Sequence, residues 1–190
     1  EEALLLRAFA ETAPAEVLLV LVPRHPQRFD EVAALIESAG LVYQRRSSLD
    51  GTHLHADTRV LLGDSLGELF AYYAACDVAF VGGSLLPLGG QNLIEAASVG
   101  RPVLVGPHTF NFDEATRLAI EAGAALRVND AGDLLAKALK LLRDAPERAR
   151  MGEAGLAFAA RHRGAAGRVG ELIVRLRASG AGRSRPGRQG

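Results

Sequence analysis

The sequence predicts an α/β domain in which helices cover both faces of a parallel sheet. Two observations support this prediction. Short apolar runs of β type alternate with runs whose apolar residues recur at helical spacing. The 190 residues are also 48% hydrophobic, which is enough apolar material for one sizeable core. We therefore expect a single folded domain over residues 1–178.

The first half of the chain alternates helices with strands. Thr12-Ala13-Pro14 stops the first helical pattern before the apolar run Val17–Val22, which is typical of a buried strand. Pro26 suits the first turn of the next helix, and Gly40 suits the position just after its end. The elements expected here are helices over 1–10 and 26–39 and strands over 17–22, 41–43 and 60–62, with a polar loop over 45–59.

The second half continues the alternation and contains more helix. Its most irregular segment is a glycine-rich connection over residues 82–90. The expected strands are 77–81, 103–105 and 124–128, and the expected helices are 65–76, 92–99, 113–122, 131–143, 146–161 and 167–177. Residues 179–190 are mostly Gly, Arg and Ser with almost no apolar side chain, so we expect a disordered tail there.

Composition excludes several classes of protein and site. Because 22 Lys and Arg balance 22 Asp and Glu, the chain lacks the general attraction that a nucleic-acid binder or a polybasic membrane anchor needs. The single cysteine, Cys76, excludes an internal disulfide and a cysteine-built zinc site, and its apolar helix face favours a structural role. No apolar run approaches the roughly 20 residues of a membrane span. The start, Glu1-Glu2-Ala3, is unlike a signal peptide, so we expect an excised piece of a cytosolic protein.

Three loops that follow expected strands are the candidate ligand-binding segments, because open α/β sheets bind ligands at the carboxyl ends of their strands. In the first, Pro23-Arg24-His25-Pro26, the planar guanidinium of Arg24 suits a phosphate or a carboxylate. A solvated loop arginine is the alternative. His25 is more typical of a hydrogen bond within the loop.

The second loop is Gly63–Glu68. Ser65 and Glu68 have the spacing of a helix capping box, which is a structural role. Gly67 would fall in the first helical turn, where glycine costs roughly 0.5–1 kcal/mol relative to alanine, so we expect its missing side chain to let a ligand approach. The segment also matches G-x-S-x-G, the nucleophile turn of a serine hydrolase. A triad would need His108 or His162 with Asp113 or Asp130, and no spacing selects among them.

The third loop carries two glycine pairs, Gly82-Gly83 and Gly89-Gly90. Converging backbone amides beside a helix that starts at Asn92 would form an anion nest suited to a phosphate without any lysine. Glu95 suits ribose hydroxyls, although Asn92 and Glu95 also fit a capping box. The chain has neither G-x-G-x-x-G nor a P-loop lysine here, which favours a nucleotide-sugar over a dinucleotide or a nucleoside triphosphate.

Four segments, present together and in order, resemble the Kdo transferases, which are the 3-deoxy-D-manno-octulosonic acid transferases of lipopolysaccharide assembly. The segments are Val22–Pro26, Gly63–Leu69, Phe80–Ser84 and Gly106–Phe112. The resemblance covers residues 1–178. It implies the Rossmann-like carboxyl-terminal, donor-binding half of an inverting GT-B enzyme, which moves Kdo from CMP-Kdo to a lipid A precursor.

The resemblance assigns donor contacts to the candidate loops. It implies that Pro23 and Arg24 contact CMP, that Leu66, Gly67 and Glu68 line the nucleotide pocket, that Gly82, Gly83 and Ser84 shape its phosphate side, and that Asn92, Leu93, Ile94 and Glu95 hold phosphate and ribose. No catalytic residue, metal or cofactor is implied in this chain. The family's catalytic glutamate and membrane-associating surface belong to the amino-terminal domain, at the cytoplasmic face of the bacterial inner membrane. This domain alone is expected to bind and not to catalyse.

Leu88 and Gln91 depart from the family, which usually has R-G-G-H-N where this chain has Leu88-Gly89-Gly90-Gln91-Asn92. The loss of two potentially cationic groups weakens the binding of the anionic end of the donor, although Gln91 still offers a hydrogen-bond donor. Ser65 also replaces the usual Thr. The alternatives are a GT-B enzyme that uses a UDP-sugar, such as an epimerase or another glycosyltransferase, a serine esterase built on Ser65, and a non-catalytic interaction domain.

Overall fold

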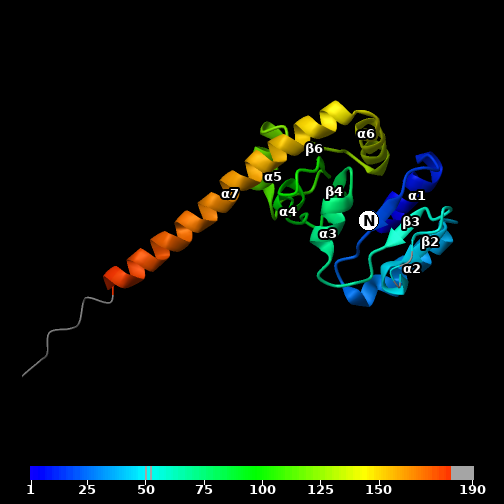
Figure 1. Ribbon diagram of the computed structural model, residues 1–190, viewed down its shortest axis with the longest axis horizontal. Helices are drawn as coiled ribbons and strands as arrows, with labels where there is room; N and C mark the ends of the chain where they lie inside the picture. The colour runs from blue at the N-terminus through cyan, green and yellow to red at the C-terminus, as the bar shows by residue number, and fades with distance from the viewer. Residues whose placement is uncertain (50, 52, 181–190) are drawn as a thin grey trace, which may run out of the picture.

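The structure, a computed structural model, describes residues 1–49, 51 and 53–180, with side chains as far as residue 162. Figure 1 shows two halves side by side, from which one long helix, α7, extends away. The α-helices are α1 (Glu2–Thr12), α2 (Phe29–Ser38), α3 (Leu69–Ala75), α4 (Ile94–Ala97), α5 (Asp113–Glu121), α6 (Ala131–Arg143) and α7 (Ala145–Gly180), and η1 (Pro26–Arg28) and η2 (Arg46–Ser48) are 3-10 turns. The helical and extended segments alternate as the sequence predicts.

Six short strands form two parallel sheets of three strands each. They are β1 (Leu19–Leu21), β2 (Tyr43–Arg45), β3 (Val60–Leu62), β4 (Ala79–Val81), β5 (Val103–Val105) and β6 (Ala125–Arg127). The orders are β1-β3-β2 and β4-β5-β6, with Val60 opposite Leu19 and Tyr43 and with Val103 opposite Ala79 and Ala125. The parallel arrangement is confirmed, but no ladder joins the two sheets within the described residues, whereas one sheet was expected.

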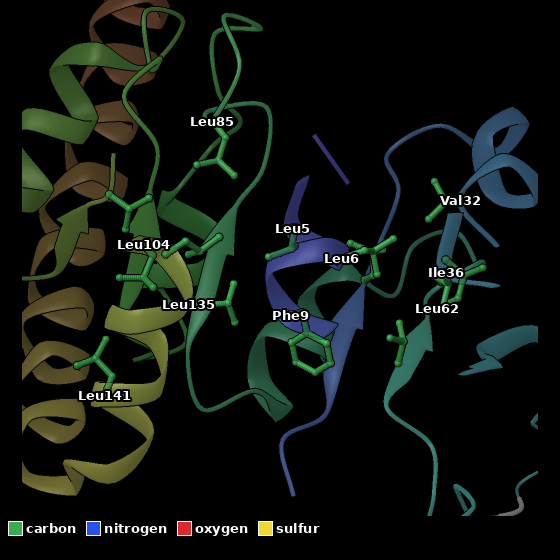
Figure 2. Packing of buried hydrophobic residues seen from close by; sticks show 14 of the residues in the cluster. Leu5, Leu6, Phe9, Val32, Ile36, Leu62, Leu85, Leu104, Leu135 and Leu141 are labelled. Atoms are coloured by element: carbon green, nitrogen blue, oxygen red, sulfur yellow. The ribbon is translucent and has the colours of Figure 1, made fainter. Parts of the chain in front are cut away.

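The two halves are joined by side chains of α1. Leu5, Leu6 and Phe9 lie between the halves in Figure 2 and belong to a core cluster that also contains Leu62 of one sheet and Leu104 of the other. All five side chains are at most 7% exposed. Burying a large apolar side chain stabilises a fold by about 1.5–3 kcal/mol, so packing through α1 replaces backbone hydrogen bonds as the link between the sheets.

Both faces of the second sheet are covered. Leu104 of β5 belongs to the core cluster that contains α1, whereas Val103 and Val105 belong to a second cluster with Phe158 of α7. Successive side chains of a strand point to opposite faces, so β5 contributes to both clusters. The helices therefore cover both faces of this sheet, as the near-continuous apolar run of β5 indicates.

Helix α7 differs from the prediction, because one helix spans the region where two were expected. Isolated glycines weaken a helix by about 1 kcal/mol but do not end it, and no proline follows until Pro186. Residues 179 and 180 end this helix, and the rest of the tail expected to be disordered, residues 181–190, lies outside the described residues. The search of the described residues found no helix that is both long and apolar enough to span a bilayer.

Small residues let α7 pack against the end of α4. A Cβ atom added to Gly152 would lie 2.3 Å from the carbonyl oxygen of Gly100, and one added to Gly155 would lie 3.0 Å from that of Ala97. The distance at residue 152 is too short for a Cβ atom, so glycine is required there, whereas a Cβ atom at residue 155 would make a tight contact. The contact anchors the segment that follows the glycine-rich loop.

Candidate functional site

The loops after β1 and β3 lie beside each other. The amide of Gly63 donates to the carbonyl oxygen of Leu21 at 2.8 Å, which continues the pairing of the two strands into their loops. Pro23 is buried, and Arg24 and His25 are exposed. The loop 23–26 therefore places a cation at the carboxyl end of the sheet, as predicted.

A side-chain hydrogen bond connects this loop to the glycine-rich loop of the other half. Arg24 Nη1 donates to Gln91 Oε1 at 2.5 Å, across 67 residues of sequence. The other amide atom of Gln91, Nε2, lies 3.5 Å from the position of a Cβ atom built on Gly83. Gln91, which the sequence marks as a departure, thus lies between Arg24 and the first glycine pair.

The segment 106–112 joins the same edge. The amide of His108 donates to the carbonyl oxygen of Ser84 at 2.9 Å, and the amide of Asn111 donates to that of Gly89 at 3.0 Å. All four segments that carry the resemblance therefore meet at one edge of the molecule, although they are far apart in sequence.

The loop over residues 63–68 departs from its predicted structure. Helix α3 starts only at Leu69, and Gly67 has φ +80°, outside any helix. Ser65 Oγ donates to the Glu68 carboxylate and caps no backbone amide. The expected capping box and the helical position of Gly67 are therefore wrong, because a left-handed residue cannot continue a right-handed helix. This φ explains the glycine at residue 67 without any ligand.

Glu68 is the charged side chain at the end of this loop. Besides the bond from Ser65, its Oε1 accepts a hydrogen bond from Arg46 Nη2 at 2.9 Å. The Ser65 hydrogen bond lowers the pKa of Glu68 below its ordinary value, partial burial opposes this, and the charge of Arg46 adds to the lowering. Glu68 is therefore held as a carboxylate. Leu66 beside it is 72% exposed.

The serine-esterase alternative lacks its geometry. The partners of Ser65 Oγ are the Glu68 carboxylate and Tyr72 Oη, the latter at 3.3 Å, and no histidine bonds to it among the described residues. His162 instead bonds to the carbonyl oxygen of Phe158 through Nδ1 at 3.2 Å. A serine nucleophile needs a histidine within hydrogen-bond distance, so this reading is not favoured.

Cys76 has the structural role expected from the sequence. Its thiol donates to the carbonyl oxygen of Tyr73 at 3.3 Å, and burial raises its pKa above the ordinary value. The thiolate, which is the reactive form of cysteine, is therefore disfavoured.

The glycine-rich loop forms the predicted amide nest, and a side chain of the protein fills it. The consecutive amides of Gly83, Ser84 and Leu85 donate to the carboxylate of Glu1, with distances of 3.1 Å from Ser84 and 2.6 Å from Leu85. Gly83 has φ +72°, the left-handed conformation that turns successive amides toward one anion. Sequence reasoning missed Glu1, because an acidic residue before a helix is common and no local pattern links it to residue 83.

Ser84 serves the loop itself. Its side chain is fully buried, and its hydroxyl donates to the carbonyl oxygen of Val81 at 2.6 Å and accepts from the amide of Gly106 at 2.8 Å. The hydroxyl is thus committed to holding the loop between β4 and β5, and Ser84 can shape the site only through its backbone.

The segment 92–95 is less helical than predicted. Helix α4 has only four residues, and Asn92 Oδ1 accepts from the amide of Ile94 at 3.0 Å, so the expected capping box with Glu95 is absent. The side chain of Leu93 is only 1% exposed and belongs to the core, whereas Glu95 is exposed. So short a helix has only a small dipole. The amides of Gln91, Asn92 and Leu93 donate to no other described residue.

Two hollows of about 400 Å³ lie away from the shared edge, one beside α1 and α2 and one between α5 and α7. Among the described residues, no three His, Cys, Asp or Glu side chains are grouped so that they could hold a metal ion. The edge therefore offers an arginine, backbone amides and carboxylates to a ligand.

Comparison with known proteins identifies the relatives of this chain. The family profile described as "Glycosyl transferases group 1" matches residues 4–158. The 3-deoxy-D-manno-octulosonic acid transferase of Bordetella pertussis is 58% identical over 153 residues, which are 80% of this chain and 35% of that protein. The enzyme of the same name from Haemophilus influenzae is 42% identical over 158 residues, or 83% of this chain and 36% of that protein. The chain thus spans about a third of these relatives.

A solved structure shows the same fold. It is the crystal structure of the C-terminal CMP-Kdo binding domain of WaaA from Acinetobacter baumannii, which is 38% identical, with a TM-score of 0.74 over 84% of this chain and 81% of that one. The resemblance to the Kdo transferases is thereby confirmed, and the fold is that of the Rossmann-like carboxyl-terminal domain of a GT-B enzyme. With the profile covering most of its length, this chain belongs to the group 1 glycosyl transferases.

Proposed function

We propose that this chain is the donor-binding part of a Kdo transferase and that it binds CMP-Kdo at the edge where the four segments meet. The observation that carries the proposal is the bond between Arg24 and Gln91, which brings loops from both halves to one place. The likeness to a CMP-Kdo binding domain supports the choice of ligand. Because the chain spans about a third of its relatives, transfer of Kdo to a lipid A precursor at the inner membrane belongs to the proposal for the whole protein.

The phosphate of CMP would lie between Arg24 and the segment that begins at Gln91. Arg24 is exposed and uses one guanidinium nitrogen on Gln91, which leaves other donors for a phosphate oxygen. The amides of Gln91, Asn92 and Leu93, which donate to no other described residue, would supply neutral donors beside it. One arginine with backbone amides is sufficient for a phosphate, so the zero formal charge of the chain is no obstacle.

Carboxylates would hold the nucleoside. Glu95 is exposed and does not cap α4, which leaves both oxygens to accept hydrogen bonds from ribose hydroxyls. Glu68 and the exposed Leu66 would contact the base, since a charged acceptor suits its amino group and an apolar side chain suits its ring. Pro23 and Gly67 would set the backbone of the two loops around the nucleotide.

The reaction would divide between this chain and the rest of the protein. The bond between the anomeric carbon of Kdo and the CMP phosphate oxygen breaks, and a bond from the acceptor oxygen to that carbon forms while a base takes the acceptor proton. Negative charge then grows on the departing CMP. Arg24 and the neighbouring amides would stabilise that charge, which lowers the barrier only because the charge is greater in the transition state than in the bound donor. The base would come from the amino-terminal part.

Nucleotide specificity tests this proposal. We expect calorimetric titration of the chain to show binding of CMP and CMP-Kdo, with clearly weaker binding of UMP and UDP-sugars. Tighter binding of UDP-sugars would point to another GT-B enzyme of the UDP-sugar class. Absence of binding by all of these nucleotides would favour an interaction domain and refute the proposal.

A further inference from the structure

The carboxylate of Glu1 is bound by the glycine-rich loop as an external anion would be. Gly83 donates to Oε2, and Ser84 and Leu85 donate to Oε1, so three consecutive amides share one charged acceptor. The side chain of Glu1 is only 11% exposed. Hydrogen bonds to a charged acceptor are about twice as strong as neutral ones, and the sequence separation of more than 80 residues excludes a merely local contact.

The backbone of Glu1 is fixed by helix α1. Its carbonyl oxygen accepts from the amides of Leu4 at 3.1 Å and Leu5 at 3.2 Å, which makes its backbone part of the start of α1. Helix α1 is fixed in turn by Leu6 and Phe9, each 1% exposed, between the two halves of the molecule (Figure 2). An anion entering the nest would have to displace a side chain that the core keeps in place.

The loop that Glu1 holds carries the rest of the candidate site. The carbonyl oxygen of Gly83 accepts from the amide of Gly90 at 2.7 Å, directly before Gln91. Gln91 in turn accepts from Arg24 at 2.5 Å. The contacts therefore run without a gap from the Glu1 carboxylate through both glycine pairs to the arginine proposed to bind phosphate.

We infer that Glu1 is a positioning residue of the donor site: its carboxylate occupies the amide nest of residues 83–85, so these amides shape the loop and do not bind the donor phosphate, and the loop so held places Gln91 to orient Arg24. This inference rests on the proposed function. It assigns the phosphate to Arg24 and the amides of residues 91–93, at the other end of the loop.

Amide signals in an NMR spectrum test the contact without any nucleotide. We expect the signals of Gly83, Ser84 and Leu85 to lie at low field in the unaltered chain, because their amides donate to a carboxylate. The variant Glu1→Ala should move all three signals to higher field, and Glu11→Ala, on the exposed part of the same helix, should leave them unchanged. Signals of residues 83–85 that stay in place in Glu1→Ala would overturn the inference.

Affinity for CMP tests the positioning role. We expect Glu1→Ala to weaken CMP binding about tenfold, with partial recovery in Glu1→Asp, which keeps a carboxylate. In the Arg24→Ala background, Glu1→Ala should change the affinity by less than about twofold, because its effect passes through Arg24. A purely structural role would give independent, multiplicative losses of affinity.

Other outcomes separate the inference from its alternatives. If Glu1→Ala binds CMP or inorganic phosphate more tightly than the unaltered chain, the nest is itself the phosphate site and Glu1 competes with the donor, which overturns the inference. Unchanged CMP affinity in Glu1→Ala also overturns it. If the unaltered chain binds no CMP, the proposed function fails, and the positioning role fails with it, while the amide signals still decide whether Glu1 fills the nest.

Discussion

Arg24→Ala is the most direct test of the candidate site. The guanidinium of Arg24 is exposed at the end of β1 and makes one described side-chain hydrogen bond, to Gln91 Oε1 at 2.5 Å. No core contact depends on it, since the neighbouring Pro23 supplies the buried side chain of this loop. The substitution therefore removes a cation from the edge while leaving the fold intact.

The magnitude follows from the kind of bond that is lost. A hydrogen bond to a charged group contributes about 1.5–3 kcal/mol, which corresponds to roughly 10-fold to 150-fold in affinity. Because Arg24 is exposed, solvent screens its charge, so we expect a loss of CMP affinity near the lower limit, about tenfold. The exposed bond to Gln91 contributes little to stability, so the free energy of unfolding should change by less than about 1 kcal/mol.

Calorimetry with CMP and urea unfolding measure the two quantities on the same protein. Arg7→Ala is the matched control, because Arg7 is an exposed arginine on the surface of α1 whose one ion pair among the described residues is with Glu11. Arg24→Lys should recover part of the affinity, since it keeps the charge and loses the planar fork. A folded Arg24→Ala variant that binds CMP as tightly as the unaltered chain would remove Arg24 from the site and with it the main argument for the edge.

Two further substitutions test the local structure. Gly67→Ala should lower the melting temperature by about 2–6 °C, because φ +80° costs an L-residue roughly 1–2 kcal/mol. Gly67→Asn should lower the melting temperature less, because Asn tolerates the left-handed conformation better. A raised melting temperature in Gly67→Ala would indicate that residue 67 is helical. Tyr73 tests the pH dependence: burial, with a smaller effect of the Glu95 charge, raises its pKa to about 12. Its contribution to stability is complete below pH 10, where the tyrosine of the unfolded chain begins to ionise, and disappears as the pH rises toward 12. Between pH 10 and 11 the unaltered chain should therefore lose about 1 kcal/mol more free energy of unfolding than Tyr73→Phe, and equal losses would contradict the burial of this hydroxyl.

The order of helices and strands was accessible from the sequence because it depends on local signals. The apolar runs at β1, β3 and β5 and the helical spacing in α6 predict their elements almost to the residue for β3, β5 and α6. Predictions failed where the same short pattern of residues is compatible with two local structures. The spacing of Ser65 and Glu68 fits a capping box, but the left-handed Gly67 between them keeps the helix from starting before Leu69. The glycines after Arg161 suggest a break, yet α7 continues through them.

The family and the strand-end position of its ligand-binding loops are properties that the sequence alone determines, since four short segments in fixed order carry both. Only the tertiary structure decides which side chains meet. The bond between Arg24 and Gln91 and the contact of Glu1 with residues 83–85 join positions 67 to 84 residues apart, and no periodicity or motif encodes such pairs. They arise because α1 packs between the two halves and so sets the distance between their loops. A nest of amides is predictable from glycines, but which anion fills it depends on what the folded core brings within reach.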